Sequence, residues 1–204
     1  MPVNDIKYER HDIFSAPIFQ FENKVLINEL KEFILEREIS GIESNVAKEI
    51  KSNLHESAFD FFQNESQIVL NTRNFVAYCI KKVINDIKDE KFDYELNFSE
   101  SWYHVGETNS SHDIHNHANC SWCGIYYIQS GDPDSGGQTF FQNPINSIYK
   151  DYGTDHIEKS AIAITPSDGL LVIFPSILNH YQALYTGKMK RIVVAFNTRV
   201  LGKV

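Results

Sequence analysis

The sequence predicts an α+β fold dominated by strands, or a β-barrel that carries a layer of helices. Helical periods occupy the first 93 residues, short β-rich runs fill the remainder, and the two patterns do not alternate as βαβ units would. With 204 residues, the chain is long enough for one domain with its own core. We expect residues 1–93 to form a helical support region and residues 94–200 to form the β core.

Three segments of the first region follow a helical period. In residues 24–38, apolar side chains fall on one face and charged ones on the other, and residues 72–88 repeat this pattern. Residues 44–62 show the same period more weakly, because Asn53 and His55 interrupt it. We expect a helix in all three segments.

From about residue 94 the chain changes to short runs rich in β-branched and aromatic residues, separated by turn residues. The expected strands are residues 96–105, 122–129, 138–141, 161–164, 169–174 and 190–199. The glycine, proline and aspartate content of residues 130–137 predicts a turn, and residues 143–160 resemble a long polar loop. Long loops in compact domains often cover functional sites.

Composition excludes several classes of partner and location. The formal net charge of −8 argues against a nucleic-acid partner, because phosphate binding needs clustered lysine and arginine. The longest apolar run, residues 169–175, is far shorter than the roughly 20 residues that cross a bilayer, and the polar start does not resemble a signal peptide. Three cysteines do not make a disulfide framework, so we expect a reducing, cytoplasmic location.

A histidine pattern points to chemistry. His115 and His117 lie two residues apart, so on an extended strand both side chains leave the same face, and His180 follows a buried-looking strand. Three ligands on one side of a transition metal leave positions open for substrate and oxygen. A metal-centred oxidation is therefore our first hypothesis. The alternative is chance spacing among the eight histidines of the chain.

The segments around these histidines carry a family resemblance by their order and spacing. They are His115–His117, Trp122–Tyr127, Gly136–Phe141, Pro166–Gly169, Phe174–Ser176, His180 and Arg191–Asn197. Over about residues 96–199, the chain resembles the iron(II)- and 2-oxoglutarate-dependent dioxygenase superfamily, and more closely its bacterial and phage members with a His-x-His motif. The resemblance implies a double-stranded β-helix, or jelly roll, with N-terminal helices packed on it and iron near one open end.

The resemblance also implies the metal ligands, which would be His115, His117 and His180 around Fe(II). Most of the superfamily has a carboxylate where this chain has His117. A third neutral imidazole would leave the iron site one unit more positive. Asp113, two residues before His115, is an alternative ligand, and in that arrangement His117 would support the site or face the substrate.

For the cosubstrate, the resemblance implies that Arg191 grips the far carboxylate of 2-oxoglutarate. A guanidinium can form two parallel hydrogen bonds to a carboxylate, which a lysine cannot match in geometry. Tyr127 would reach the same carboxylate, and Tyr103 would help from a neighbouring strand. The ordinary alternatives are a surface ion pair for Arg191 and core packing for both tyrosines.

The implied activity is hydroxylation of a small-molecule or peptide substrate by O2, with 2-oxoglutarate converted to succinate and CO2. One alternative is a three-histidine iron dioxygenase that does not use 2-oxoglutarate, and another is a jelly-roll binding module without catalysis. The Cys120-Ser121-Trp122-Cys123 segment invites a redox or zinc assignment, but one Cys-x-x-Cys pair lacks the remaining zinc ligands and small apolar packing is favoured. If the chain assembles, we expect a homodimer, the commonest symmetric assembly.

Overall fold

The computed structural model describes residues 16–39, 51–88, 92–144 and 160–202. Its elements, in chain order, are β1 (Phe19–Glu22), α1 (Ile27–Ile39), β2 (Lys51–Glu56), a 3-10 helix (Phe61–Gln63), α2 (Gln67–Ile87), β3 (Tyr94–His115), β4 (Trp122–Gln129), β5 (Thr139–Gln142), β6 (Ala161–Ile164), β7 (Leu170–Pro175), β8 (His180–Tyr185) and β9 (Arg191–Gly202). Among the described helices, none is both long and apolar enough to span a membrane.

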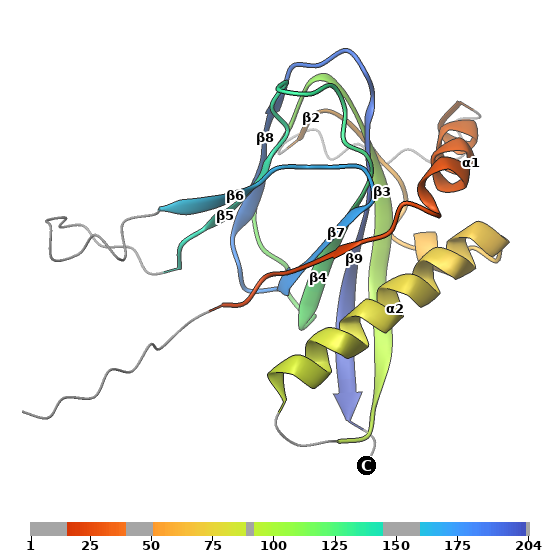
Figure 1. The fold of residues 1–204 in the computed structure, drawn as a ribbon, viewed down its shortest axis with the longest axis vertical. Coiled ribbons are helices and arrows are strands. Elements are labelled where there is room, and N and C mark those ends of the chain that lie inside the picture. Colours follow the sequence, from red (N-terminus) through yellow and green to blue (C-terminus); the bar gives the residue numbers. More distant parts are fainter. Residues whose placement is uncertain (1–15, 40–50, 89–91, 145–159, 203–204) are drawn as a thin grey trace, which may run out of the picture.

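The described strands form one nine-stranded sheet in the order β1-β7-β4-β9-β3-β8-β5-β6, with β2 paired to β3. Every paired strand in it runs antiparallel to its neighbour. The sheet curls into a half-barrel, and both α-helices lie on the outer side of the β3, β4, β7 and β9 wall (Figure 1). The predicted α+β class, mainly β with N-terminal helices packed on it, is therefore confirmed.

The strand β3 connects the two halves of the curled sheet. Residues 94–106 pair with β9, whereas residues 110–115 pair with β8 on the opposite edge. Asn109 has a positive φ of 68°, and the register with β8 shifts twice, so the strand bends where it changes partner. This bend brings the end of β3 next to the start of β8.

Most expected elements are present, with some different ends. The strands β4 and β6 have the predicted bounds, β3 and β9 extend beyond them, and residues 130–137 form the expected turn. The helix expected at residues 72–88 begins earlier, at Gln67. The strands β1 and β8 were not predicted. Most of the loop expected at residues 143–160 lies outside the described residues.

The prediction of a helix over residues 44–62 is wrong for its described part. Residues 51–56 form the strand β2, which pairs with β3, and only Phe61–Gln63 make a short 3-10 helix. Leu54 and Glu56 are buried while His55 is exposed, which is the two-residue period of a strand. Pairing with β3 outweighs the weak local helical period. The rest of that segment, residues 40–50, lies outside the described residues.

The hydrophobic core between the helices and the sheet is built from one face of α2. Its buried side chains are Ile68, Val69, Val76, Cys79, Ile80, Val83 and Ile84. They form one cluster with outward-facing residues of the sheet, among them Tyr126, Leu171 and Val194. The helical layer thus supports the wall whose other face lines the interior of the half-barrel.

Alternation along the strands separates the two faces of this wall. Tyr126 and Val194 belong to the core under the helices, whereas Tyr127 and Val193 belong to a second buried cluster inside the half-barrel. Arg191 stands two residues before Val193 on β9 and also lines the interior. The strand period therefore decides which side chains can take part in a site.

Replacing Ile80 with alanine is expected to lower the free energy of unfolding by about 2–5 kcal/mol, because it removes a wholly buried side chain and leaves a cavity. Urea unfolding followed by circular dichroism measures this change. The matched control is Lys81→Ala on the exposed side of the same helix, expected to stay within about 0.5 kcal/mol of the wild type. Equal losses in both variants would contradict the described packing of α2.

Candidate metal centre and its pocket

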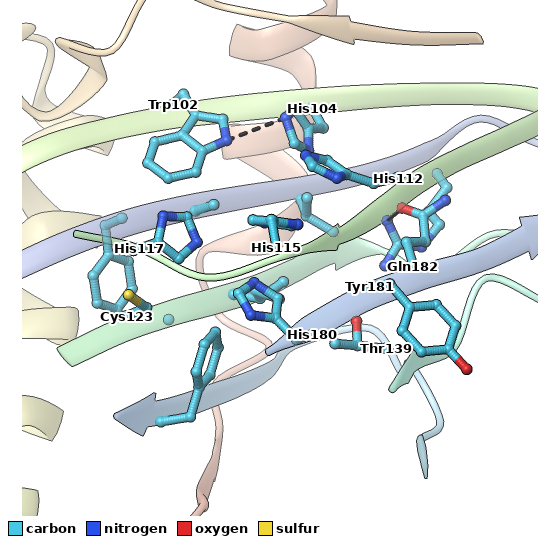
Figure 2. A pocket seen from close by; sticks show the side chains of 17 residues that line it. Trp102, His104, His112, His115, His117, Cys123, Thr139, His180, Tyr181 and Gln182 are labelled. Carbon is cyan, nitrogen blue, oxygen red and sulfur yellow. Dashed lines mark hydrogen bonds between the residues drawn. The ribbon is translucent and has the colours of Figure 1, made fainter. Parts of the chain in front are cut away.

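Three histidines, two of them on strands and one just after β3, meet in the pocket of the half-barrel. His115 ends β3 and pairs directly with His180 at the start of β8, while His117 follows two residues later. The backbone N–H of His117 donates to the carbonyl of Ser176 at 3.1 Å, which holds the chain after β3 near the start of β8. One ring nitrogen of each histidine lies within 4.8 Å of those of the other two. Figure 2 shows the three rings gathered at the centre of the pocket.

Hydrogen bonds to backbone carbonyls set the tautomer of two of these rings. His115 Nδ1 lies 2.8 Å from the carbonyl oxygen of Asp113, and His180 Nδ1 lies 3.0 Å from that of Leu178. A carbonyl oxygen only accepts, so in both rings Nδ1 carries the proton and donates it. The lone pair of each ring then lies on Nε2, which is the form in which a neutral imidazole binds a metal ion.

The surroundings of His180 keep its ring neutral. Burial, together with the neighbouring His115 and His117, lowers the pKa of His180 to about 3. The hydrogen bond to the Leu178 carbonyl acts in the opposite direction but does not outweigh burial. The ring of Phe174 packs edge-on against His180 with 4.7 Å between ring centroids. A neutral imidazole is the form that binds a metal, so this ring needs no deprotonation at neutral pH.

The carboxylate of Asp113 does not join the three histidines. Asp113 is exposed, and only its backbone carbonyl takes part, as acceptor for His115. Among the described residues, the group of side chains close enough to share a metal ion consists of His115, His117 and His180 alone. The structure therefore brings together the three-histidine arrangement rather than the Asp113 alternative.

Arg191 supplies a buried positive charge to the same pocket. Its Nη1 donates to Gln182 Oε1 at 2.7 Å, and its guanidinium carbon lies 5.2 Å from the centre of the Tyr127 ring. Within the described part of the chain, its Nε has no hydrogen-bond partner and no carboxylate pairs with the guanidinium. Burial lowers the pKa of Arg191, yet a guanidinium stays protonated in proteins, so this charge calls for an anion.

Of the two tyrosines expected near Arg191, the structure brings only one to it. The Tyr127 hydroxyl lies 2.7 Å from Thr139 Oγ1, and burial raises the pKa of Tyr127 although Arg191 opposes this, so the hydroxyl keeps its proton. Tyr103 points to the other face of the sheet, where its ring lies 5.5 Å from that of Phe61 in the core under the helices.

Several pocket residues were not singled out from the sequence. They are Trp102, His104, His112, Thr139, Tyr181 and Gln182, with Glu56 behind them. His104 Nε2 lies 2.6 Å from the buried carboxylate of Glu56, and the His112 ring stacks on His115 with 4.0 Å between centroids. The two-residue period of β3 was a signal for Trp102 and His104. Gln182 would have followed from His180 had β8 been recognised.

The donor set fits a transition metal and a small anion side by side. Three neutral imidazoles bind divalent iron, and their placement on one side leaves coordination positions open. Arg191 and Thr139 line the same pocket, with Thr139 and Gln182 on one side of the histidines and Trp102 and Cys123 on the other (Figure 2). A ligand that chelates the metal through one end and carries a carboxylate at its far end matches this layout.

Comparison with protein families gives one match. The model of a family described as "Putative 2OG-Fe(II) oxygenase" matches residues 100–197, which include the three histidines, Tyr127 and Arg191. The resemblance drawn from the sequence is thereby confirmed. Of the curated proteins compared, none matches this sequence.

Solved structures share the fold at low sequence identity. A prolyl-4-hydroxylase from Pseudomonas putida is 16% identical, with a TM-score of 0.64 over 91% of this chain and 94% of its own. A prolyl hydroxylase from Trichoplax adhaerens, in complex with a hypoxia inducible factor peptide fragment, is 14% identical, with a TM-score of 0.60 over 88% and 82%. HygX from Streptomyces hygroscopicus, with nickel and 2-oxoglutarate bound, is 12% identical, with a TM-score of 0.59 over 90% and 83%. The double-stranded β-helix is confirmed.

Proposed function

Because residues 100–197 match the model of this 2OG-Fe(II) oxygenase family, we propose that the protein is an iron(II)- and 2-oxoglutarate-dependent dioxygenase. It hydroxylates a small-molecule or peptide substrate and releases succinate and CO2. The observation that carries this proposal is the convergence, in a single pocket, of three histidines and one buried arginine that pairs with no carboxylate of the described residues. Either feature alone is compatible with a structural role, whereas together they match a metal and its chelating cosubstrate.

In this proposal His115, His117 and His180 would hold the iron. When bound, iron(II) and 2-oxoglutarate together supply the electrons that activate O2. The carbonyl acceptors of Asp113 and Leu178 orient two of the rings and fix their protons on Nδ1. Three neutral ligands leave the full charge of the metal uncompensated, which favours an anionic chelator in the open positions.

Arg191 binds the far carboxylate of 2-oxoglutarate through the N–H groups of its guanidinium, among them the N–H of Nε. Gln182 holds Nη1 and so fixes the direction in which the guanidinium faces. The Tyr127 and Thr139 hydroxyls, now bonded to each other, lie beside the same anion site and can donate to it. The apolar cluster of Phe174, Val193 and its neighbours excludes water from this end of the pocket.

Replacing Gln182 with glutamate is expected to raise the KM for 2-oxoglutarate about tenfold or more, with little change in iron(II) affinity. The new carboxylate would pair with Arg191 Nη1 at the 2.7 Å that the amide oxygen now occupies, and it would cancel the charge that attracts the cosubstrate. Initial rates of succinate formation measure this effect. An unchanged KM would contradict the placement of the anion beside Arg191.

The direct test is 2-oxoglutarate turnover by the purified protein with iron(II) and air. We expect succinate to form in a reaction that needs all three components and that a candidate substrate accelerates. Oxygen consumption with iron but without 2-oxoglutarate would instead favour a three-histidine iron dioxygenase. Tight zinc binding without either reaction would favour a binding module.

The substrate class and the cellular setting are also proposals. A peptide substrate is supported by the similarity to the Trichoplax adhaerens enzyme, whose structure is in complex with a peptide fragment. A reducing, cytoplasmic location is supported by the free thiols of all three cysteines. We further propose that the chain works as a single oxygenase domain, since α2 packs directly on the β core.

A further inference from the structure

Two cysteines, of which Cys123 lines the pocket, face each other and have no part in the proposed reaction. Cys120 lies in the turn before β4, and Cys123 is the second residue of that strand. Their Sγ atoms are 3.6 Å apart, and both thiols are free. The third cysteine, Cys79, lies in α2 on the other face of the sheet, in the core under the helices.

Hydrogen bonds to neighbouring segments hold the backbone around Cys120 and Cys123 in place. Ser121 N donates to the carbonyl of Thr198 at 2.9 Å, and Ser176 N donates to the carbonyl of Ser121 at 3.1 Å. Ser176 Oγ also donates to the carbonyl of Cys120 at 2.7 Å. Because a disulfide needs about 2.05 Å between sulfurs, closure requires the two Sγ atoms to approach by about 1.5 Å. The fold therefore keeps the thiols in contact before any bond forms.

The two thiols differ in exposure and acidity. Cys120 is partly exposed. Its pKa is lowered, chiefly by its contact with Cys123 and further by Ser176 and Arg199, whereas burial and the charge of Glu100 act in the opposite direction. Cys123 is buried, and the contact with Cys120 and its burial raise its pKa. Cys120 is thus the accessible nucleophile and Cys123 the thiol that stays protonated beside it.

We propose that Cys120 and Cys123 are a peroxide-reactive dithiol that closes to an intramolecular disulfide at the pocket wall. The Cys120 thiolate attacks hydrogen peroxide, so that an S–O bond forms, the O–O bond breaks and hydroxide leaves as water after protonation. The Cys123 sulfur then attacks this sulfenic acid, so that the S–S bond forms, the S–O bond breaks and a second water leaves with the Cys123 proton. Two thiols lose two electrons and one peroxide becomes two waters.

The bridge would alter the wall of the pocket itself. Cys123 lines the pocket, and its thiol now donates to Asn197 Oδ1 at 3.2 Å, a bond that the disulfide removes. Cys120 follows His117 by three residues in the same turn. This oxidation site stands independently of the proposed oxygenase reaction, because it rests on the two sulfurs and their surroundings alone.

The test counts thiols in the full-length chain before and after treatment with a slight excess of hydrogen peroxide, with a chelator present so that bound iron forms no radicals. We expect the three thiols of the chain to fall to one. Peptide mass spectrometry should find Cys120 joined to Cys123, two hydrogen atoms lighter than the dithiol, with Cys79 still reduced. Dithiothreitol should restore all three thiols.

Two single variants separate the roles of the sulfurs. In Cys123→Ser, Cys120 should stop at the sulfenic acid, which dimedone traps, whereas in Cys120→Ser the buried Cys123 should stay reduced at the same peroxide dose. Oxidation of Cys79 at the rate of the pair, disulfide-linked dimers in place of the internal bridge, or loss of Cys123 in the Cys120→Ser variant would overturn the proposal. Three unreacted thiols in the wild type would overturn it as well.

Discussion

Replacing His180 with alanine is expected to weaken iron(II) binding by more than about 100-fold and to abolish succinate formation. Changes to residues that merely support a metal ligand already cost about 10–100-fold in affinity, and removal of one of three ligands costs more. His180 is also the most buried of the three, so water replaces its nitrogen poorly. Anaerobic titration with iron(II) measures the affinity.

The matched control for this experiment is His55→Ala. His55 is an exposed histidine on β2 and does not line the pocket, so iron(II) affinity and turnover should stay at the wild-type level. Thermal unfolding of both variants shows whether the fold is retained. Unchanged iron(II) affinity in a folded His180→Ala protein would contradict the three-histidine centre.

Replacing Arg191 with methionine is expected to raise the Kd for 2-oxoglutarate at least about 100-fold while changing iron(II) affinity little. Each hydrogen bond between charged groups contributes about 1.5–3 kcal/mol, and Arg191 can form two of them to one carboxylate. Since about 1.4 kcal/mol of binding free energy changes Kd tenfold, the loss of both bonds should raise Kd by at least about two orders of magnitude. Methionine keeps the apolar bulk over the Tyr127 ring, so the fold should tolerate the change. Isothermal titration with 2-oxoglutarate and a redox-inert divalent metal measures the effect.

The control for Arg191→Met is Lys188→Met, which removes a positive charge from an exposed position in the turn just before β9. Long-range attraction of the cosubstrate would weaken in both variants to a similar degree, whereas direct contact weakens it only in Arg191→Met. A comparable loss in the two variants would contradict a contact between Arg191 and the cosubstrate.

The β core was predictable because its signals are local. The β-branched and aromatic residues of Trp122–Gln129 and the apolar run that becomes β7 each specify a strand within their own few residues. The three glycines and the single proline of residues 130–137 specify the turn between β4 and β5 in the same way. Long-range information was not needed for these elements.

The elements that were missed depend on distant partners. Residues 51–56 carry a weak helical period and become the strand β2 only by pairing with β3. The sequence of β8, from His180 to Tyr185, places polar side chains in a strand held between β3 and β5. Tertiary pairing, which a local pattern cannot reveal, decides both cases.

The residues of the candidate site also divide into those with a local sequence signal and those that depend on distant partners. The spacing of His115, His117 and His180 and the position of Arg191 were readable because each lies in a short motif of conspicuous residue types. The role of Gln182 could not be predicted from the sequence, because it comes from a hydrogen bond between its side chain and that of Arg191 inside the half-barrel. Tyr103 was misplaced by one step of the strand alternation, which sends it to the opposite face of the sheet.

The most direct test of the account is the visible absorption of the anaerobic complex of the protein with iron(II) and 2-oxoglutarate. If the three histidines hold iron and Arg191 anchors the cosubstrate, a weak metal-to-ligand band should appear only when both are added. It should disappear in His180→Ala and weaken strongly in Arg191→Met. Iron(II) binding without any band in the wild-type protein would contradict the account.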